Sequence, residues 1–105
     1  MNIIYVTASS IEEAKTIAKH LLEKKMIACA NIYSNVTSIY CDNGIKEATE
    51  AVLIVKTIEA KYNAVKKEIE NMHSYTIPCI LKISAKANKK YEEWVKKQIK
   101  SSSQK

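Results

Sequence analysis

Arginine and phenylalanine are absent from this 105-residue sequence, and glycine, proline and aspartate occur only once each. Arginine supplies the planar fork that binds guanine and phosphate through paired hydrogen bonds, so its absence argues against nucleic acid and phosphate as ligands. The net charge is nevertheless +6, and lysine supplies all of the positive charge that is permanent at neutral pH. Because a lysine-rich surface attracts small anions, an anionic metabolite remains a candidate ligand.

The three cysteines, Cys29, Cys41 and Cys79, form an odd number and show no paired spacing. They predict free thiols rather than a disulfide framework, and we expect a protein of the reducing cytoplasm. The chain starts with a strand-like segment and has no apolar run long enough to span a membrane. We therefore expect neither a signal peptide nor a membrane partner, and the length predicts a single domain, residues 1–105.

Two long strand-like arms within residues 27–57 are the main feature of the sequence. The first arm ends near Tyr40, the turn Cys-Asp-Asn-Gly occupies residues 41–44, and the return arm ends at Thr57. This pattern predicts a β-hairpin. An arm of about 14 residues would span roughly 46 Å, whereas a compact domain of this length is about 33 Å across. The hairpin must therefore bend, project from the domain or lie on another surface.

The other segments alternate between strand and helix patterns. Residues 2–7 predict a buried strand, and a serine pair followed three residues later by a glutamate pair predicts a capping box that opens a helix. We expect Thr57 to cap a second helix, Pro78 to start a strand and Asn88 to cap a last helix. A polar tail follows at residues 101–105. The order βαββαβ plus a C-terminal helix predicts an α+β, ferredoxin-like sandwich.

Several uses of this fold require residues that the chain lacks. An RNA-recognition sheet stacks bases on aromatic side chains of its inner strands, and phenylalanine is absent. A soft-metal chaperone carries a Cys-x-x-Cys loop before its first helix, where this chain has Thr-Ala-Ser-Ser at residues 7–10. His73 and Cys79 would suit a nucleophilic enzyme, but no catalytic motif surrounds them. We therefore expect a binding protein that is not an enzyme and does not bind nucleic acid.

Three residues are candidate metal ligands. His73 follows the second predicted helix and is either a ligand of copper or zinc or a histidine that interacts with the helix dipole. Cys79 follows Pro78 at the start of a strand, where its thiol can face a cleft. Cys29 lies between two alanines in the hairpin and is either a soft-metal ligand or a small core or interface residue.

Tyr75, Glu50 and Lys56 are candidate residues of a ligand cleft. Tyr75 either donates a hydrogen bond into a site or anchors its loop. By strand alternation, one face of the return arm combines charged and apolar side chains: Lys46, Ala48, Glu50, Val52, Ile54 and Lys56. Such a face indicates either charge pairs between strands or subunits, or an ordinary solvated edge.

Motifs spread over nearly the whole chain resemble the CutA divalent-cation tolerance proteins. The longest are Ala-Cys-Ala-Asn-Ile at 28–32, Val-Thr-Ser-Ile-Tyr at 36–40 and Val-Leu-Ile-Val-Lys-Thr at 52–57. Shorter matches are Thr-Ala at 7–8, His-x-Tyr-x-x-Pro at 73–78 and Tyr-x-x-Trp at 91–94. Several motifs at consistent spacing make the resemblance specific.

The resemblance implies a ferredoxin-like subunit and a tight homotrimer, in which the long hairpin strands pair with those of neighbouring subunits. It also implies a trimer similar to the PII signalling proteins and a role in tolerance of copper or another divalent metal ion, with any metal in the cleft between subunits. The alternative is a PII-like sensor that binds a small anionic metabolite at this cleft through Lys56 and neighbouring lysines. A trimeric scaffold for a protein partner is the third candidate.

The chain departs from the family pattern at several places. Ser-Asn at residues 34–35 replaces the usual Pro-Gly of a bend, although asparagine can support a bulge or a positive φ. The hairpin tip lacks the family's tryptophan. The positions that match the copper ligands of bacterial members are Val6, Met72 and His73, so one of three is retained. Cys79 replaces a glutamate and would form a softer site together with His73.

Overall fold

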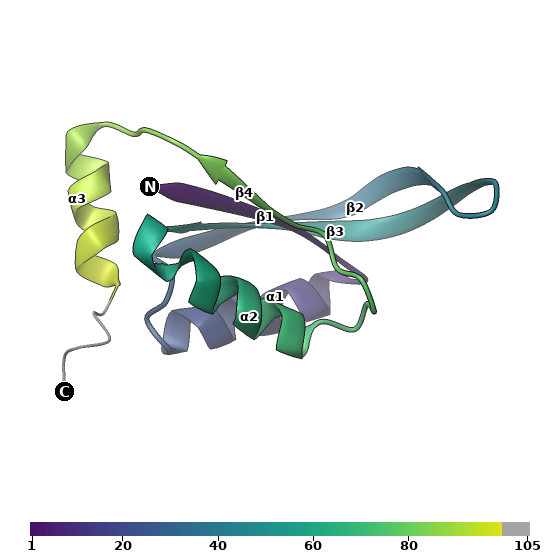
Figure 1. The fold of residues 1–105 in the computed structure, drawn as a ribbon, viewed down its shortest axis with the longest axis horizontal. Coiled ribbons are helices and arrows are strands. Elements are labelled where there is room, and N and C mark those ends of the chain that lie inside the picture. The colour runs from purple at the N-terminus through teal and green to yellow at the C-terminus, as the bar shows by residue number, and fades with distance from the viewer. Residues whose placement is uncertain (100–105) are drawn as a thin grey trace.

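The computed structural model describes residues 1–99, and the predicted polar tail at residues 101–105 lies outside this range. Four strands, β1 (Asn2–Ala8), β2 (Cys29–Cys41), β3 (Ile45–Thr57) and β4 (Ile80–Ser84), form an antiparallel sheet in the order β2-β3-β1-β4. Helices α1 (Ile11–Glu23) and α2 (Tyr62–Met72) cover one face of this sheet, and α3 (Lys89–Gln98) lies at the end remote from the hairpin tip (Figure 1). The predicted α+β, ferredoxin-like fold is confirmed.

Side-chain alternation along the inner strands builds the core between the sheet and the two helices. In β1, every second residue from Asn2 to Ala8 is buried. The members of this core from β3 and the helices are mostly branched aliphatic residues: Leu53, Val55, Ile17, Leu21, Val65 and Ile69. Fully burying one such side chain stabilises the fold by about 1.5–3 kcal/mol. The period of two in the strands and the near-four period in the helices therefore direct the apolar faces toward one another.

The hairpin projects from the body of the molecule, and this outcome was one of the three expected from its length (Figure 1). The molecule measures 48 × 29 × 20 Å along its principal axes. β3 pairs with β1 only from Ala51 to Thr57, whereas it pairs with β2 from Ile45 to Lys56. The outer half of β3 is therefore supported by β2 alone, because β1 ends at Ala8.

A bulge interrupts the pairing of β2 with β3 between Tyr33 and Val36. Asn35 has a φ of 57°, in the left-handed region that asparagine tolerates better than most residues. This confirms that Ser-Asn at residues 34–35 supports a bulge. The bulge lies close to the point where β3 leaves β1, so the hairpin changes course at the position where it begins to project.

Predicted helix and strand boundaries were correct in part. Ser10 is the N-cap of α1, and its hydroxyl accepts a hydrogen bond from the N–H of Glu13 at 3.1 Å, as the capping box predicts. The prediction that Thr57 caps the second helix is wrong, because its buried hydroxyl donates to the carbonyl oxygen of Met26 at 2.8 Å. Asn88 precedes α3 but makes no side-chain capping bond. β4 begins at Ile80, two residues after the predicted start.

Several apolar side chains remain exposed away from the core. Leu81 and Ile83 of β4 are 51% and 48% exposed on the face of the sheet opposite α1 and α2. At the hairpin, Ile39 and Ile45 are 66% and 83% exposed. No helix within residues 1–99 is long and apolar enough to cross a membrane.

Replacing Thr57 with valine should destabilise the fold by about 0.5–1.5 kcal/mol, because the carbonyl of Met26 would lose the hydrogen bond from this buried hydroxyl while side-chain shape is kept. Urea denaturation at fixed protein concentration, monitored by circular dichroism, measures this change in the free energy of unfolding. Thr49→Val, at an exposed position of the projecting hairpin, is the matched control. Equal unfolding midpoints for the two variants would contradict the role of this bond.

Candidate functional site

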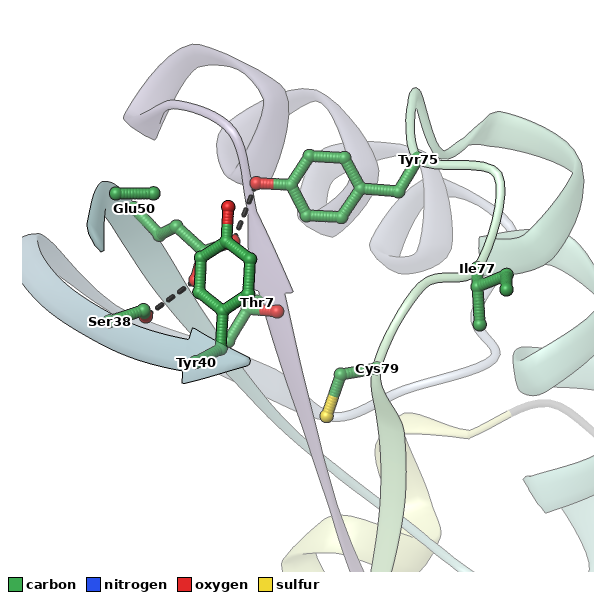
Figure 2. Close-up of a pocket in the computed structure, with 8 residues that line it drawn as sticks. Thr7, Ser38, Tyr40, Glu50, Tyr75, Ile77 and Cys79 are labelled. Atoms are coloured by element: carbon green, nitrogen blue, oxygen red, sulfur yellow. Dashed lines mark hydrogen bonds between the residues drawn. The ribbon is translucent and has the colours of Figure 1, made fainter. Parts of the chain in front are cut away.

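A cleft of about 530 Å³ lies where the hairpin leaves the body of the molecule. Its walls are Thr7 of β1, Ser38 and Tyr40 of β2, Ala48 and Glu50 of β3, and Tyr75, Ile77 and Cys79 of the loop between α2 and β4. Figure 2 shows Tyr75 reaching from that loop toward the hairpin, hydroxyl first. The site therefore combines four segments that are distant in the sequence.

Among residues 1–99, Glu50 is the only acidic residue that lines this cleft. One of its carboxylate oxygens accepts a hydrogen bond from the hydroxyl of Ser38, and the other accepts from the hydroxyl of Tyr75 at 2.6 Å. Burial and the hydrogen bond to Glu50 raise the pKa of Tyr75 well above its usual value. Tyr75 therefore stays protonated and donates to the carboxylate throughout the physiological pH range.

His73 lies behind the cleft with a fully buried side chain. Its Nε2 lies 2.7 Å from the carbonyl oxygen of Thr7, and its Nδ1 accepts a hydrogen bond from the N–H of Tyr75 at 3.0 Å. A carbonyl can only accept and an N–H can only donate, so the ring is neutral and carries its proton on Nε2. Neither nitrogen then has a free lone pair for a metal ion in this arrangement.

Glu13 of α1 connects the helix to the loop that bears His73. Its Oε1 accepts from the N–H and hydroxyl of Ser9, and its Oε2 accepts from the N–H of Ser74 at 2.8 Å. The Nδ1 atom of His73 is 3.8 Å from Oε2, but the contact is not an ion pair because that nitrogen is unprotonated. Burial opposes ionisation of Glu13, yet the hydrogen bonds from Ser9 and Ser74 outweigh it and lower the pKa of Glu13 to about 2.

The structure brings together four of the six predicted site residues. Glu50, Tyr75 and Cys79 line the cleft, and His73 lies against Tyr75, with ring centroids 4.7 Å apart. Cys29 and Lys56 face each other across β2 and β3 at the other end of the sheet. Lys56 pairs with Ile3 of β1, four residues or about 13 Å from Thr7.

Cys29 and Lys56 instead contact α3. Cys29 Sγ is 3.2 Å from the hydroxyl oxygen of Tyr91, and Lys56 Nζ is 5.6 Å from the centre of the Tyr91 ring. The hydrogen bond with Cys29, together with burial, raises the pKa of Tyr91 to about 12. Among residues 1–99, no three or more His, Cys, Asp or Glu side chains gather closely enough to hold a metal ion.

Ser38, Tyr40 and Glu13 were not predicted as site residues. Ser38 lies opposite Ala48, diagonal to Glu50, and this pairing depends on the register after the bulge. The capping-box spacing predicted that Glu13 would bond to the start of its own helix, and it does bond to Ser9. The bond from Ser74 had no sequence signal because the two residues are 61 positions apart.

These features define an α+β sandwich with a projecting hairpin and a cleft at its base. The family model for the CutA1 divalent ion tolerance protein matches residues 2–98. The divalent-cation tolerance protein CutA of Archaeoglobus fulgidus is 45% identical over 95 residues, which are 90% of this chain and 93% of that protein. CutA of Thermus thermophilus is 36% identical over 96 residues, which are again 90% of this chain and 93% of that protein.

Solved structures agree with these sequence matches. The structure of the periplasmic divalent cation tolerance protein CutA from Archaeoglobus fulgidus has a TM-score of 0.90 and 44% identity, covering 94% of this chain and 98% of that one. CutA1 from Pyrococcus horikoshii has a TM-score of 0.91 and 33% identity, covering 96% and 100%. The chain belongs to the CutA1 divalent ion tolerance protein family.

The low pKa of Glu13 predicts a specific loss of stability in acid. The folded pKa of about 2 is below the unfolded value of 4.5, so the contribution of Glu13 is fully present above pH 4.5 and is lost as the pH falls toward 2. Glu13→Gln should be less stable than wild type at neutral pH, and the difference should shrink over that window.

Thermal unfolding of wild type and Glu13→Gln from neutral pH down to about pH 2 measures this difference in stability. Glu12→Gln, in the same helical turn at an exposed position, is the matched control and should keep the wild-type profile. A stability difference between Glu13→Gln and wild type that does not change with pH would contradict the role of this carboxylate.

Proposed function

We propose that this chain forms a homotrimer that takes part in the response to divalent metal ions by binding, not by catalysis. The observation that supports this proposal most directly is the match of residues 2–98 to the CutA1 divalent ion tolerance family. The projecting hairpin supports the assembly, and the cleft at its base supports the binding role.

The exposed parts of the sheet suit contacts between copies of this chain. β2 is 13 residues long and lies at the edge of the sheet, so one side of its backbone has no strand partner within residues 1–99. Such an edge is a template for another strand. The exposed side chains of Ile39, Ile45, Leu81 and Ile83 would become buried if the hairpin lay against a neighbouring subunit.

The metal ion is proposed to bind in the cleft, with Cys79 and Glu50 as the ligands that one subunit provides. A thiolate suits copper or zinc, and a carboxylate is an ordinary additional ligand. His73 would become a ligand only after breaking its hydrogen bond to Thr7 or to Tyr75. Cys29 is remote from this cleft within one subunit. The remaining ligands would come from water or from neighbouring subunits.

The PII-like alternative, binding of a small anionic metabolite, receives less support from the geometry. Lys56 lies against Tyr91 at the other end of the sheet, and no lysine of residues 1–99 lines the cleft, which instead contains Glu50. We place the protein in the cytoplasm because Cys29, Cys41 and Cys79 are all free thiols. The relative from Archaeoglobus fulgidus is, by contrast, described as periplasmic.

Size-exclusion chromatography with light scattering should give about three times the 11.9 kDa mass of one chain. Replacing Ile45 with lysine should weaken the assembly, because a charge would enter the apolar contact at the hairpin. Lys97→Glu, on α3 at an exposed position, is the control that should leave the mass unchanged. A stable wild-type monomer at micromolar concentration would overturn the trimer.

Calorimetric titration with Cu(I), Cu(II) and Zn(II) tests the metal site. Cys79→Ser should lower the affinity for at least one of these ions by about tenfold or more, because a hydroxyl is a much poorer ligand than a thiolate. Cys41→Ser at the exposed hairpin tip is the matched control. His73→Ala should have the smaller effect, and equal binding by wild type and Cys79→Ser would remove Cys79 from the site.

A further inference from the structure

The cleft at the base of the hairpin contains the carboxylate of Glu50, which has no cationic partner among residues 1–99. Glu50 receives its hydrogen bonds from the hydroxyls of Ser38 and Tyr75, which are neutral donors. They orient the carboxylate, but as neutral groups they do not compensate its charge. Within residues 1–99, no lysine or histidine nitrogen lies at ion-pair distance from Glu50. Lys46, on the same face of β3, is four residues away, or about 13 Å.

The size of the cleft exceeds what a single metal ion requires. Its volume of about 530 Å³ falls within the range of about 300–1,000 Å³ that is usual for small-molecule sites. Ile77 and Ala48 contribute apolar surface to its walls. A ligand that fills this space must therefore present carbon as well as charge.

Two aromatic rings accompany the carboxylate. Tyr40 and Tyr75 both line the cleft, and Tyr40 is 48% exposed (Figure 2). The hydroxyl of Tyr75 is committed to Glu50, which fixes the position of its ring. Aromatic faces attract cations within about 6 Å of the ring centre, and alkylated ammonium groups are the ligands that such sites recognise best.

Taken together, the unpaired carboxylate, the two tyrosines and the apolar walls lead us to propose that this cleft binds a small organic ammonium compound, with a quaternary ammonium group held between Glu50 and the rings of Tyr40 and Tyr75. This inference shares its cleft with the proposed metal site, but it does not depend on a metal being bound there. A metal ion coordinated by Glu50 would compete with this ligand, since both require the same carboxylate.

Choline and its neutral isostere dimethylbutanol, in which a tert-butyl group replaces the trimethylammonium group, provide a matched pair of probes. The two molecules have nearly the same shape, so a difference in affinity reports the charge. Titration followed by amide NMR spectra should show choline binding at least tenfold more tightly, with shifts at residues of the cleft. The affinity for choline should fall as salt is added, because the carboxylate is only partly buried.

Variants of the cleft test the individual contacts. Glu50→Gln should abolish the difference between the two probes, and Tyr40→Ala should weaken choline binding by roughly 2- to 30-fold. Glu47→Gln is the matched control, because Glu47 lies on the same strand three residues away and faces the opposite side of the sheet. Its affinity for choline should equal that of wild type.

Equal affinities of wild type for choline and dimethylbutanol, or no shifts in the cleft at millimolar choline, would overturn the proposal. The wild-type comparison remains decisive even where a variant fails to fold. Light scattering and metal titration on the same preparation separate this outcome from failure of the proposed function. A trimer that binds metal through Cys79 but ignores choline would refute only the ammonium site, whereas choline binding without metal binding would refute only the metal role.

Discussion

Strand β3 lies between β1 and β2 for only about half of its length, because β1 is shorter than the hairpin strands. The shape of the molecule depends on this difference in strand length. From Ala51 to Thr57 it is a central strand of the sheet, with Leu53 and Val55 buried beneath the helices. From Ile45 to Glu50, its only strand partner within residues 1–99 is β2, and these two strands project as a two-stranded ribbon. Two-stranded ribbons are marginal on their own, so the outer half of the hairpin is the least supported part of the sheet. The cleft forms at the boundary, where the end of β1 leaves one wall of the ribbon uncovered.

Hydrogen bonds from three residues attach the loop after α2 to this boundary. Glu13 accepts from Ser74, His73 contacts Thr7 and Tyr75, and Tyr75 donates to Glu50 on the hairpin. Every link joins a donor to an acceptor, and no described buried side-chain nitrogen or oxygen lacks a partner. His73 acts here as a neutral connector. The network therefore holds the hydroxyl of Tyr75 against the carboxylate of Glu50 in a cleft of mixed polarity.

The sequence pointed to most of the residues of this region but not to their roles. His73 was expected as a metal ligand or as a histidine at a helix end, and in the fold both of its nitrogens are used in hydrogen bonds. Glu50 and Lys56 were correctly placed on one face of β3, yet they are six positions apart along the strand, so they lie at different ends of the sheet. Spacing along a strand predicts the face of a side chain, but it does not predict which distant segment packs against it. Ser38 and the contact of Glu13 with Ser74 escaped prediction for this reason.

The sequence by itself determined the order of elements, the sandwich class, the long hairpin and the family, because periodicity, capping residues and spaced motifs are local properties of the chain. It also indicated the bulge at Asn35, since asparagine tolerates a positive φ better than most residues other than glycine. Only the tertiary structure decided which groups meet. It put Cys29 against Tyr91, remote from Cys79, and hydrogen-bonded the hydroxyl of Thr57 to the carbonyl of Met26. It also brought the hydroxyls of Ser38 and Tyr75 within hydrogen-bond distance of the two carboxylate oxygens of Glu50. The physical reason is that a hydrogen bond or a packed contact requires two groups at one place, and sheet register and loop path set that place.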